Sequence, residues 1–122
     1  MLHGQQPLDF SYLIQMVGND PVFLIDFFET FILQNALYLA EINETLIKED
    51  WAKLASCAHK IKPTFSYIGR NDVKELVQTI EYNAKNMTAL NKIPKDVERL
   101  NTLSLKICEQ LEEAKKDIQS KI

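Results

Sequence analysis

His59 is the residue in this chain with the most accessible chemistry. Apolar residues recur around it at helical spacing and form one stripe, centred about 140° from the imidazole on a helical projection. The stripe consists of Leu54, Ala58, Ile61, Phe65 and Ile68. The imidazole should therefore point away from the core. Lys62 follows about one helical turn later, so its ammonium can swing beside a group bound to the ring.

Several kinds of catalytic site are excluded by the residues they need. A carboxylate-bridged metal site in a helical bundle needs Glu-x-x-His pairs, and two histidines and two apolar-flanked cysteines are too few for zinc. The sequence has no Gly-rich phosphate loop and no Gly-x-Ser-x-Gly motif. What remains is attack by the imidazole itself, which reacts well with phosphorus when one nitrogen is free and the other is held by an acceptor. We expect no metal and no cofactor.

The composition predicts a helical domain. The chain has 122 residues, of which 46% are hydrophobic and 25% charged, with only three glycines and four prolines. Few turn residues favour long elements joined by short loops. We expect residues 1–8 to form an irregular tail, in which His3 has no evident partner. Residues 9–122 should form a single domain with one core.

Charge and cysteine usage indicate the compartment and the class of partner. The net charge is −3, and no basic run resembles those that follow a phosphate backbone, so we expect no nucleic-acid binding. Cys57 and Cys108 are predicted to be core residues of a reduced, cytoplasmic protein. The N-terminus lacks the features of a signal peptide. Asp26 and Glu29 interrupt the apolar residues that precede and follow them, so we expect no membrane-spanning helix.

Capping signals predict where the first helices begin and end. A short accessory helix is expected over about residues 9–17, ended by Gly18 in a left-handed conformation. A long second helix should span about residues 21–48, with Asp20 as its cap and Pro21 at its first position.

Three further helices complete the predicted fold. The third should begin after Asp50 and run up to Gly69, and the fourth should be capped by Asn71 or Asp72. Pro94 should open the last helix. The fold class is therefore all-α, an antiparallel four-helix bundle with a short N-terminal accessory helix.

The sequence around the histidine resembles that of the histidine-containing phosphotransfer (HPt) domains of bacterial phosphorelays. Their pattern is Ala-His-x-[Leu/Ile]-Lys with a glycine two turns later. The matching residues are Ala58, His59, Ile61, Lys62 and Gly69. The resemblance covers about residues 21–111 and includes the order of the helices. It implies that His59 carries a phosphoryl group and that Lys62 stabilises it.

The resemblance also implies a residue that orients the ring. The family places Gln or Glu on the following helix, where it accepts a hydrogen bond from the nitrogen that is not phosphorylated, and that position is Glu81 here. A carboxylate there would fix the tautomer and raise the basicity of the ring. Glu81 could equally pair with Lys85, one turn further along its own helix.

Pro63 departs from the family pattern, which commonly has glycine at that position. Proline lacks the N–H that would bond to the carbonyl of His59, and inside a helix it costs about 3 kcal/mol or more. Because Phe65 and Ile68 continue the apolar stripe, we predict a local kink or widened turn rather than a helix end.

A partner should approach the helix face that carries the histidine. Small side chains there leave room for a partner surface, and Lys60 is either a solvated charge or close to the phosphate. Arg70 falls on the stripe of the histidine about 16 Å along it, at 1.5 Å per residue, and is predicted to contact the rim of the partner. The predicted binding residues are Ala55, Lys60, Ser66, Gly69 and Arg70.

The function implied by the resemblance is that of a stand-alone phosphocarrier. His59 would accept a phosphoryl group from an aspartate of one receiver domain and pass it to another receiver. Without a nucleotide-binding motif, the chain should not phosphorylate itself from ATP. We expect it to act as a monomer, with receiver domains of response regulators or hybrid histidine kinases as partners. The alternatives are a helical adaptor that docks a receiver or kinase without carrying phosphate, and a purely structural bundle.

Overall fold

Helices form every regular element of residues 6–122, the part of the chain that the computed structural model describes. His3 and most of the predicted tail lie outside these residues. In chain order the elements are α1 (Ser11–Val17), α2 (Pro21–Ile47), α3 (Trp51–Ile61), α4 (Thr64–Tyr67), α5 (Asn71–Asn86), the 3-10 helix η1 (Leu90–Lys92) and α6 (Ile93–Gln119).

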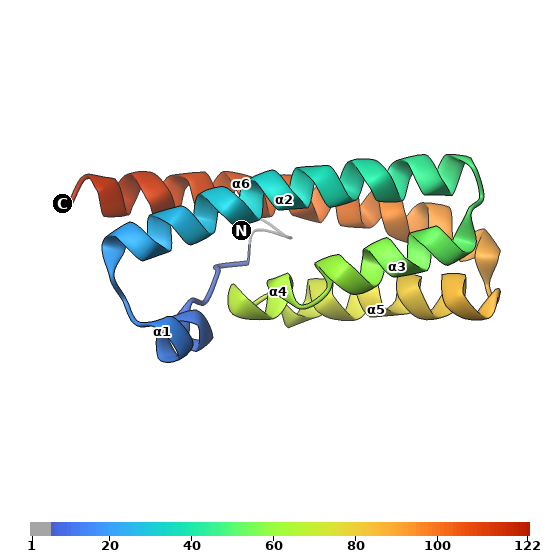
Figure 1. Ribbon diagram of the computed structural model, residues 1–122, viewed down its shortest axis with the longest axis horizontal. Helices are drawn as coiled ribbons and strands as arrows, with labels where there is room; N and C mark the ends of the chain where they lie inside the picture. The colour runs from blue at the N-terminus through green and yellow to red at the C-terminus, as the bar shows by residue number, and fades with distance from the viewer. Residues whose placement is uncertain (1–5) are drawn as a thin grey trace.

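The helices pack as an antiparallel bundle (Figure 1). α2 and α6 lie side by side, and α3, with its continuation α4, lies beside α5. α2 also contacts α3, and α5 contacts α6, so each helix of the bundle touches two neighbours. α1 lies outside the bundle, next to α4. The predicted four-helix bundle with a short accessory helix is therefore confirmed.

The core is built from the apolar stripe of each helix. Phe31 of α2 packs edge-on against Phe65 of α4, with ring centroids 5.8 Å apart and an interplanar angle of 82°. Burying one such side chain stabilises the folded state by about 1.5–3 kcal/mol. The buried face of α3 includes Ala55 and Ala58, whose small side chains let a neighbouring helix approach closely. The outer faces of α3 and α5 are thereby brought together.

Local signals set the starts of α2 and α3 as predicted. The side chain of Asp20 accepts a hydrogen bond from the amide of Val22 (3.1 Å), and α2 begins at Pro21. The side chain of Asp50 likewise accepts from the amide of Lys53 (3.2 Å) at the start of α3. These carboxylates satisfy amides that have no partner inside the helix.

The third helix is divided at Pro63, so the predicted continuous helix with a kink is wrong. α3 ends at Ile61 and α4 begins at Thr64. Proline has no N–H to donate to the carbonyl of His59. The amide of Ser66 donates instead to the carbonyl only three residues back (3.1 Å), which makes a tighter turn.

The direction of the chain nevertheless persists across the break. Lys62 (φ −53°, ψ −50°) and Pro63 (φ −64°, ψ −25°) both keep right-handed dihedral angles. Phe65 and Ile68 are consequently fully buried, as the apolar stripe predicted.

α2 is more apolar than expected from the charges of Asp26 and Glu29. By length and composition alone this helix could cross a membrane, contrary to the expectation that no segment could. The core helix of a bundle passes the same test, and α2 packs along α3 and α6. It also buries the polar residues Asn35 and Thr45, and the Thr45 hydroxyl donates to the carbonyl of Ile42 (2.9 Å). Packing inside the bundle accounts for only part of its apolar character, because 22% of its most apolar segment is buried and Phe23, Leu33 and Leu37 are exposed.

Gly69 ends α4 and lets the N-terminal segment cross over it. Its φ of +74° is left-handed, as predicted for this helix end. The amide of Asp9 donates to the carbonyl of Ile68 (3.0 Å), and a Cβ at position 69 would lie 2.6 Å from the Cβ of Asp9. Nearby, Tyr12 of α1 stacks on Tyr67 of α4, with ring centroids 5.5 Å apart. Both the backbone conformation and the close approach therefore require glycine.

Arg70 is buried at the start of α5, so its predicted role at a partner's rim is wrong. Its side chain is 1% exposed, and Nε and Nη2 donate to the two carboxylate oxygens of Asp72 at 2.9 and 3.0 Å. The chain changes direction at the left-handed turn of Gly69, so Arg70 does not lie on the same helix face as His59. The prediction that Asn71 or Asp72 caps α5 is also wrong, because Arg70 is the N-cap residue and no side chain bonds there.

Replacing Gly69 by alanine should destabilise the protein by about 2–4 kcal/mol, because a clash with Asp9 adds to the cost of the positive φ. Urea unfolding measures the loss, and faster hydrogen exchange of the Asp9 amide reports the local opening. Gly18→Ala is the matched control, since Gly18 also has a positive φ but a Cβ there would meet nothing within 4 Å. Unchanged exchange at Asp9 in Gly69→Ala would contradict the close approach.

Replacing Asp72 by asparagine should cost about 2 kcal/mol, less than the loss of a fully buried partner, because Asp72 is 43% exposed. Hydrogen bonds from Arg70 lower the pKa of Asp72 below its ordinary 3.8. The carboxylate therefore stabilises the fold above pH 3.8, and the contribution is lost as the pH falls through the lowered pKa. Urea unfolding over this range should show the difference between the two proteins closing at low pH. A difference that persists there would contradict the pairing, and Glu75→Gln, an exposed change on the same helix, is the control.

Candidate functional site

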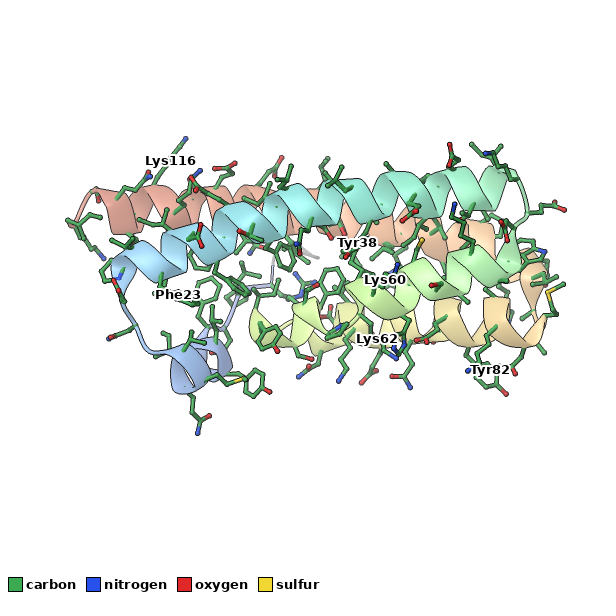
Figure 2. All side chains as sticks on the ribbon, in the orientation of Figure 1. Phe23, Tyr38, Lys60, Lys62, Tyr82 and Lys116 are labelled. Atoms are coloured by element: carbon green, nitrogen blue, oxygen red, sulfur yellow. The ribbon has the colours of Figure 1, made fainter. Side chains whose placement is uncertain are left out.

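His59 lies in the last turn of α3 and faces solvent. Its side chain is 69% exposed, in agreement with the helical projection. Figure 2 shows Lys60 and Lys62 on opposite sides of this helix, with Lys60 toward Tyr38 of α2 and Lys62 toward α5. The imidazole also reaches toward α5, because its hydrogen-bond partner is a residue of that helix.

Glu81 of α5 binds both His59 and Lys62. Its Oε2 lies 2.8 Å from Nδ1 of His59, and its Oε1 lies 2.7 Å from Nζ of Lys62. A carboxylate can only accept, so Nδ1 must carry the hydrogen of the neutral ring. The lone pair of Nε2 is then free. The structure thus brings together the three residues to which the sequence assigned the chemistry.

The charge of Glu81 is maintained by its two partners. Burial by itself raises the pKa of this carboxyl group, whose side chain is 16% exposed. Hydrogen bonds from Lys62 and then His59, together with their charges, outweigh burial and bring the pKa below its ordinary 4.5. Glu81 is therefore an anion at neutral pH.

An open groove runs between α3 and α5 beside the imidazole. It has a volume of about 410 Å³. It is lined by Ala52, Ala55, Ser56, His59, Glu81 and Lys85. The small side chains of α3 leave space next to the ring for a group that is bound to it or approaches it.

The predicted binding residues do not form one surface. Ala55 lines the groove beside the imidazole, whereas Ser66 and Gly69 line a separate groove of about 420 Å³ next to Asp9 and α1. Lys60 is exposed on the side of α3 that faces α2. With Arg70 buried, only Ala55 of the five predicted residues lies in the groove of the histidine.

Lys85 belongs to the site, although the sequence suggested it only as a competing partner of Glu81. It lines the groove beside His59 and also a second groove, of about 400 Å³, that contains Lys62 and Tyr82. Glu81 binds His59 and Lys62 rather than Lys85. Lys85 follows Glu81 by four residues, and this spacing indicates from sequence that it lies near the site, because such residues are neighbours on a helix.

Within residues 6–122, no group of three or more His, Cys, Asp and Glu side chains is arranged to hold a metal ion. The arrangement of His59, Glu81 and Lys62 is therefore one of hydrogen bonds and ion pairs.

Replacing Glu81 by alanine should release the ring, because Nδ1 loses its acceptor and the hydrogen can then occupy either nitrogen. Glu81→Gln is the matched variant: it keeps an acceptor oxygen and should retain the Nδ1–H tautomer, while Lys62 loses its counter-charge. Long-range ¹H–¹⁵N NMR of the neutral imidazole measures the tautomer ratio. The same ratio in Glu81→Ala as in the unchanged protein would contradict a positioning role for Glu81.

Comparison with known protein families matches residues 26–121 to the Hpt domain. Searches among curated proteins and among solved structures each returned no match. The matched segment contains α3, α4, α5 and the residues that surround His59. Because the match covers more than half of the chain, the protein belongs to the Hpt domain family, whose members are helical phosphocarriers that interact with receiver domains in two-component systems.

Proposed function

We propose that this protein relays a phosphoryl group from one receiver domain to another through His59. The proposal is carried by one observation: the imidazole is 69% exposed while its Nδ1 is held by Glu81 at 2.8 Å. A ring held through one nitrogen and exposed to solvent presents the other nitrogen as a nucleophile. Membership of the Hpt family supports the same role.

The proposed transfer begins from an aspartyl phosphate of the donor receiver. Nε2 of His59 attacks phosphorus in line, and the N–P bond forms as the O–P bond to the aspartate breaks. The aspartate leaves as a carboxylate with the electron pair of that bond. The hydrogen on Nδ1 stays between the ring and Glu81, so the ring gains positive charge next to an existing anion. Attack by an aspartate of the second receiver reverses these steps and frees His59.

The receiver supplies what this chain does not provide. A divalent cation in the receiver neutralises the oxygens of the transferring group, and in-line positioning supplies much of the remaining catalysis. The chain carries no nucleotide-binding motif, so ATP is not its phosphate donor. We further propose that it works as a monomer in the cytoplasm, where such receivers lie, and that it binds neither membrane nor nucleic acid.

Replacing His59 by glutamine should abolish phosphate transfer between receivers, because the amide offers no nucleophilic nitrogen. The measurement is incubation with a phosphorylated receiver, followed by analysis for acid-labile, base-stable phosphate on the protein. The unchanged protein should acquire this phosphate and lose it on addition of a second receiver. Receiver binding should persist in His59→Gln, because the exposed imidazole contributes little to folding.

Two controls separate this role from the alternatives. The unchanged protein with Mg-ATP alone should remain unlabelled, and label on His59 under that condition would contradict the absence of kinase activity. Normal relay by His59→Gln would rule out His59 as the carrier. Receiver binding without any phosphate on the unchanged protein would favour the adaptor.

A further inference from the structure

We propose that the phosphoryl group on His59 lies in the groove between α3 and α5, and that Lys85 is its principal counter-ion. This inference rests on the proposed function, because it concerns the phosphorylated state of His59. It departs from the expectation that Lys62 stabilises the phosphate. Three features of the site support it: the direction of the free nitrogen, the engagement of Lys62 and the position of Lys85.

The free nitrogen of His59 borders this groove. Side chains on a helix lean toward its N-terminus, so the ring lies over the preceding turn of α3. That turn carries Ala55 and Ser56, both of which line the groove together with His59 itself. Nδ1 is occupied by Glu81, which leaves Nε2 for the open space above these small residues. A phosphoryl group on Nε2 fits a groove of about 410 Å³.

Lys62 is already engaged with Glu81. Its Nζ lies 2.7 Å from Oε1, and its side chain is only 20% exposed. It lines the groove on the other side of Glu81, with Gln78 and Tyr82, and is not among the residues around the first groove. Moving the ammonium to the phosphate would leave the mostly buried Glu81 carboxylate with one cation fewer, and this cost opposes the exchange.

Lys85 can reach the phosphate without such a cost. It is exposed, lies one turn after Glu81 on α5, and lines the grooves on both sides of that carboxylate. Among residues 6–122, no side chain makes an ion pair or hydrogen bond with its ammonium. A phosphoryl group adds about two negative charges, and an uncommitted lysine at the edge of the groove can offset part of them.

Other lysines near α3 are less suitable. Lys53 and Lys60 are exposed on α3 but are not among the residues that line this groove. Figure 2 shows Lys60 on the α2 side of α3. Of the described residues that line the groove, Lys85 is the one with a positively charged side chain.

The test uses the full chain phosphorylated on His59 by phosphoramidate, so that no receiver is required. In this reaction the N–P bond of phosphoramidate breaks, ammonia leaves and Nε2 gains the phosphoryl group. Titration followed by ³¹P NMR then gives the pKa of the phosphoryl group. Lys85→Gln should raise this pKa by about 0.5–1 unit, because a nearby cation favours the dianion. It should also reduce the equilibrium transfer from a phosphorylated receiver by roughly 3- to 10-fold.

Matched variants separate a contact with phosphate from a structural effect. Lys85→Arg keeps the charge, so the phosphoryl pKa and the equilibrium transfer should stay close to those of the unchanged protein. Lys95→Gln removes an exposed charge on α6 and should change neither quantity. Lys62→Gln should move the ³¹P titration less than Lys85→Gln does. The opposite order, with a larger effect of Lys62→Gln and none of Lys85→Gln, would overturn the proposal. If Lys85→Gln raises the phosphoryl pKa as expected but the unchanged protein accepts no phosphate from any receiver, the position of the phosphate is supported and the proposed relay is refuted.

Discussion

The carboxylate of Glu81 is the interaction on which the site depends. One oxygen binds His59 of α3 and the other binds Lys62, the residue that follows this helix, so a single side chain of α5 holds both. The dependence is mutual, because burial alone would raise the pKa of Glu81 and its two partners keep it ionised. The orientation of the His59 ring, the charge of the Glu81 carboxylate and the position of the Lys62 ammonium therefore depend on one another. In the proposed reaction, the charge that the ring gains would fall beside an anion that is already in place.

The bundle core sets the distance between the two helices. Glu81 directly follows Ile80, which is fully buried on α5, and His59 directly follows Ala58, which is fully buried on α3. Each polar residue is thus one position away from a residue anchored in the core. Because interiors are tightly packed, such anchors hold the polar side chains to a small range of positions. The same core that stabilises the fold therefore aligns the donor and the acceptor.

Pro63 and Gly69 shape the chain immediately after the site. Pro63 ends α3 one residue beyond Lys62, while its right-handed dihedral angles keep Phe65 in the core. Gly69 then turns the chain into α5 and admits the backbone of Asp9. This segment accounts for the separation of Ser66 and Gly69 from the groove of His59. The binding surface is consequently divided between two grooves rather than continuous along one helix.

The sequence by itself determined the starts of α2 and α3 and the outward direction of His59, because capping residues such as Asp20 and Asp50 and the spacing of apolar residues act within a few residues of chain. The resemblance also identified Glu81 correctly as a neighbour of the ring. Only the tertiary structure decided that Glu81 takes Lys62 rather than Lys85, since both lysines lie within reach and the packing of α3 on α5 selects between them. It likewise decided the burial of Arg70, which depends on the turn at Gly69. Spacing along the chain indicates which residues could pair with Glu81, but the distances between helices that are remote in sequence determine which pair forms.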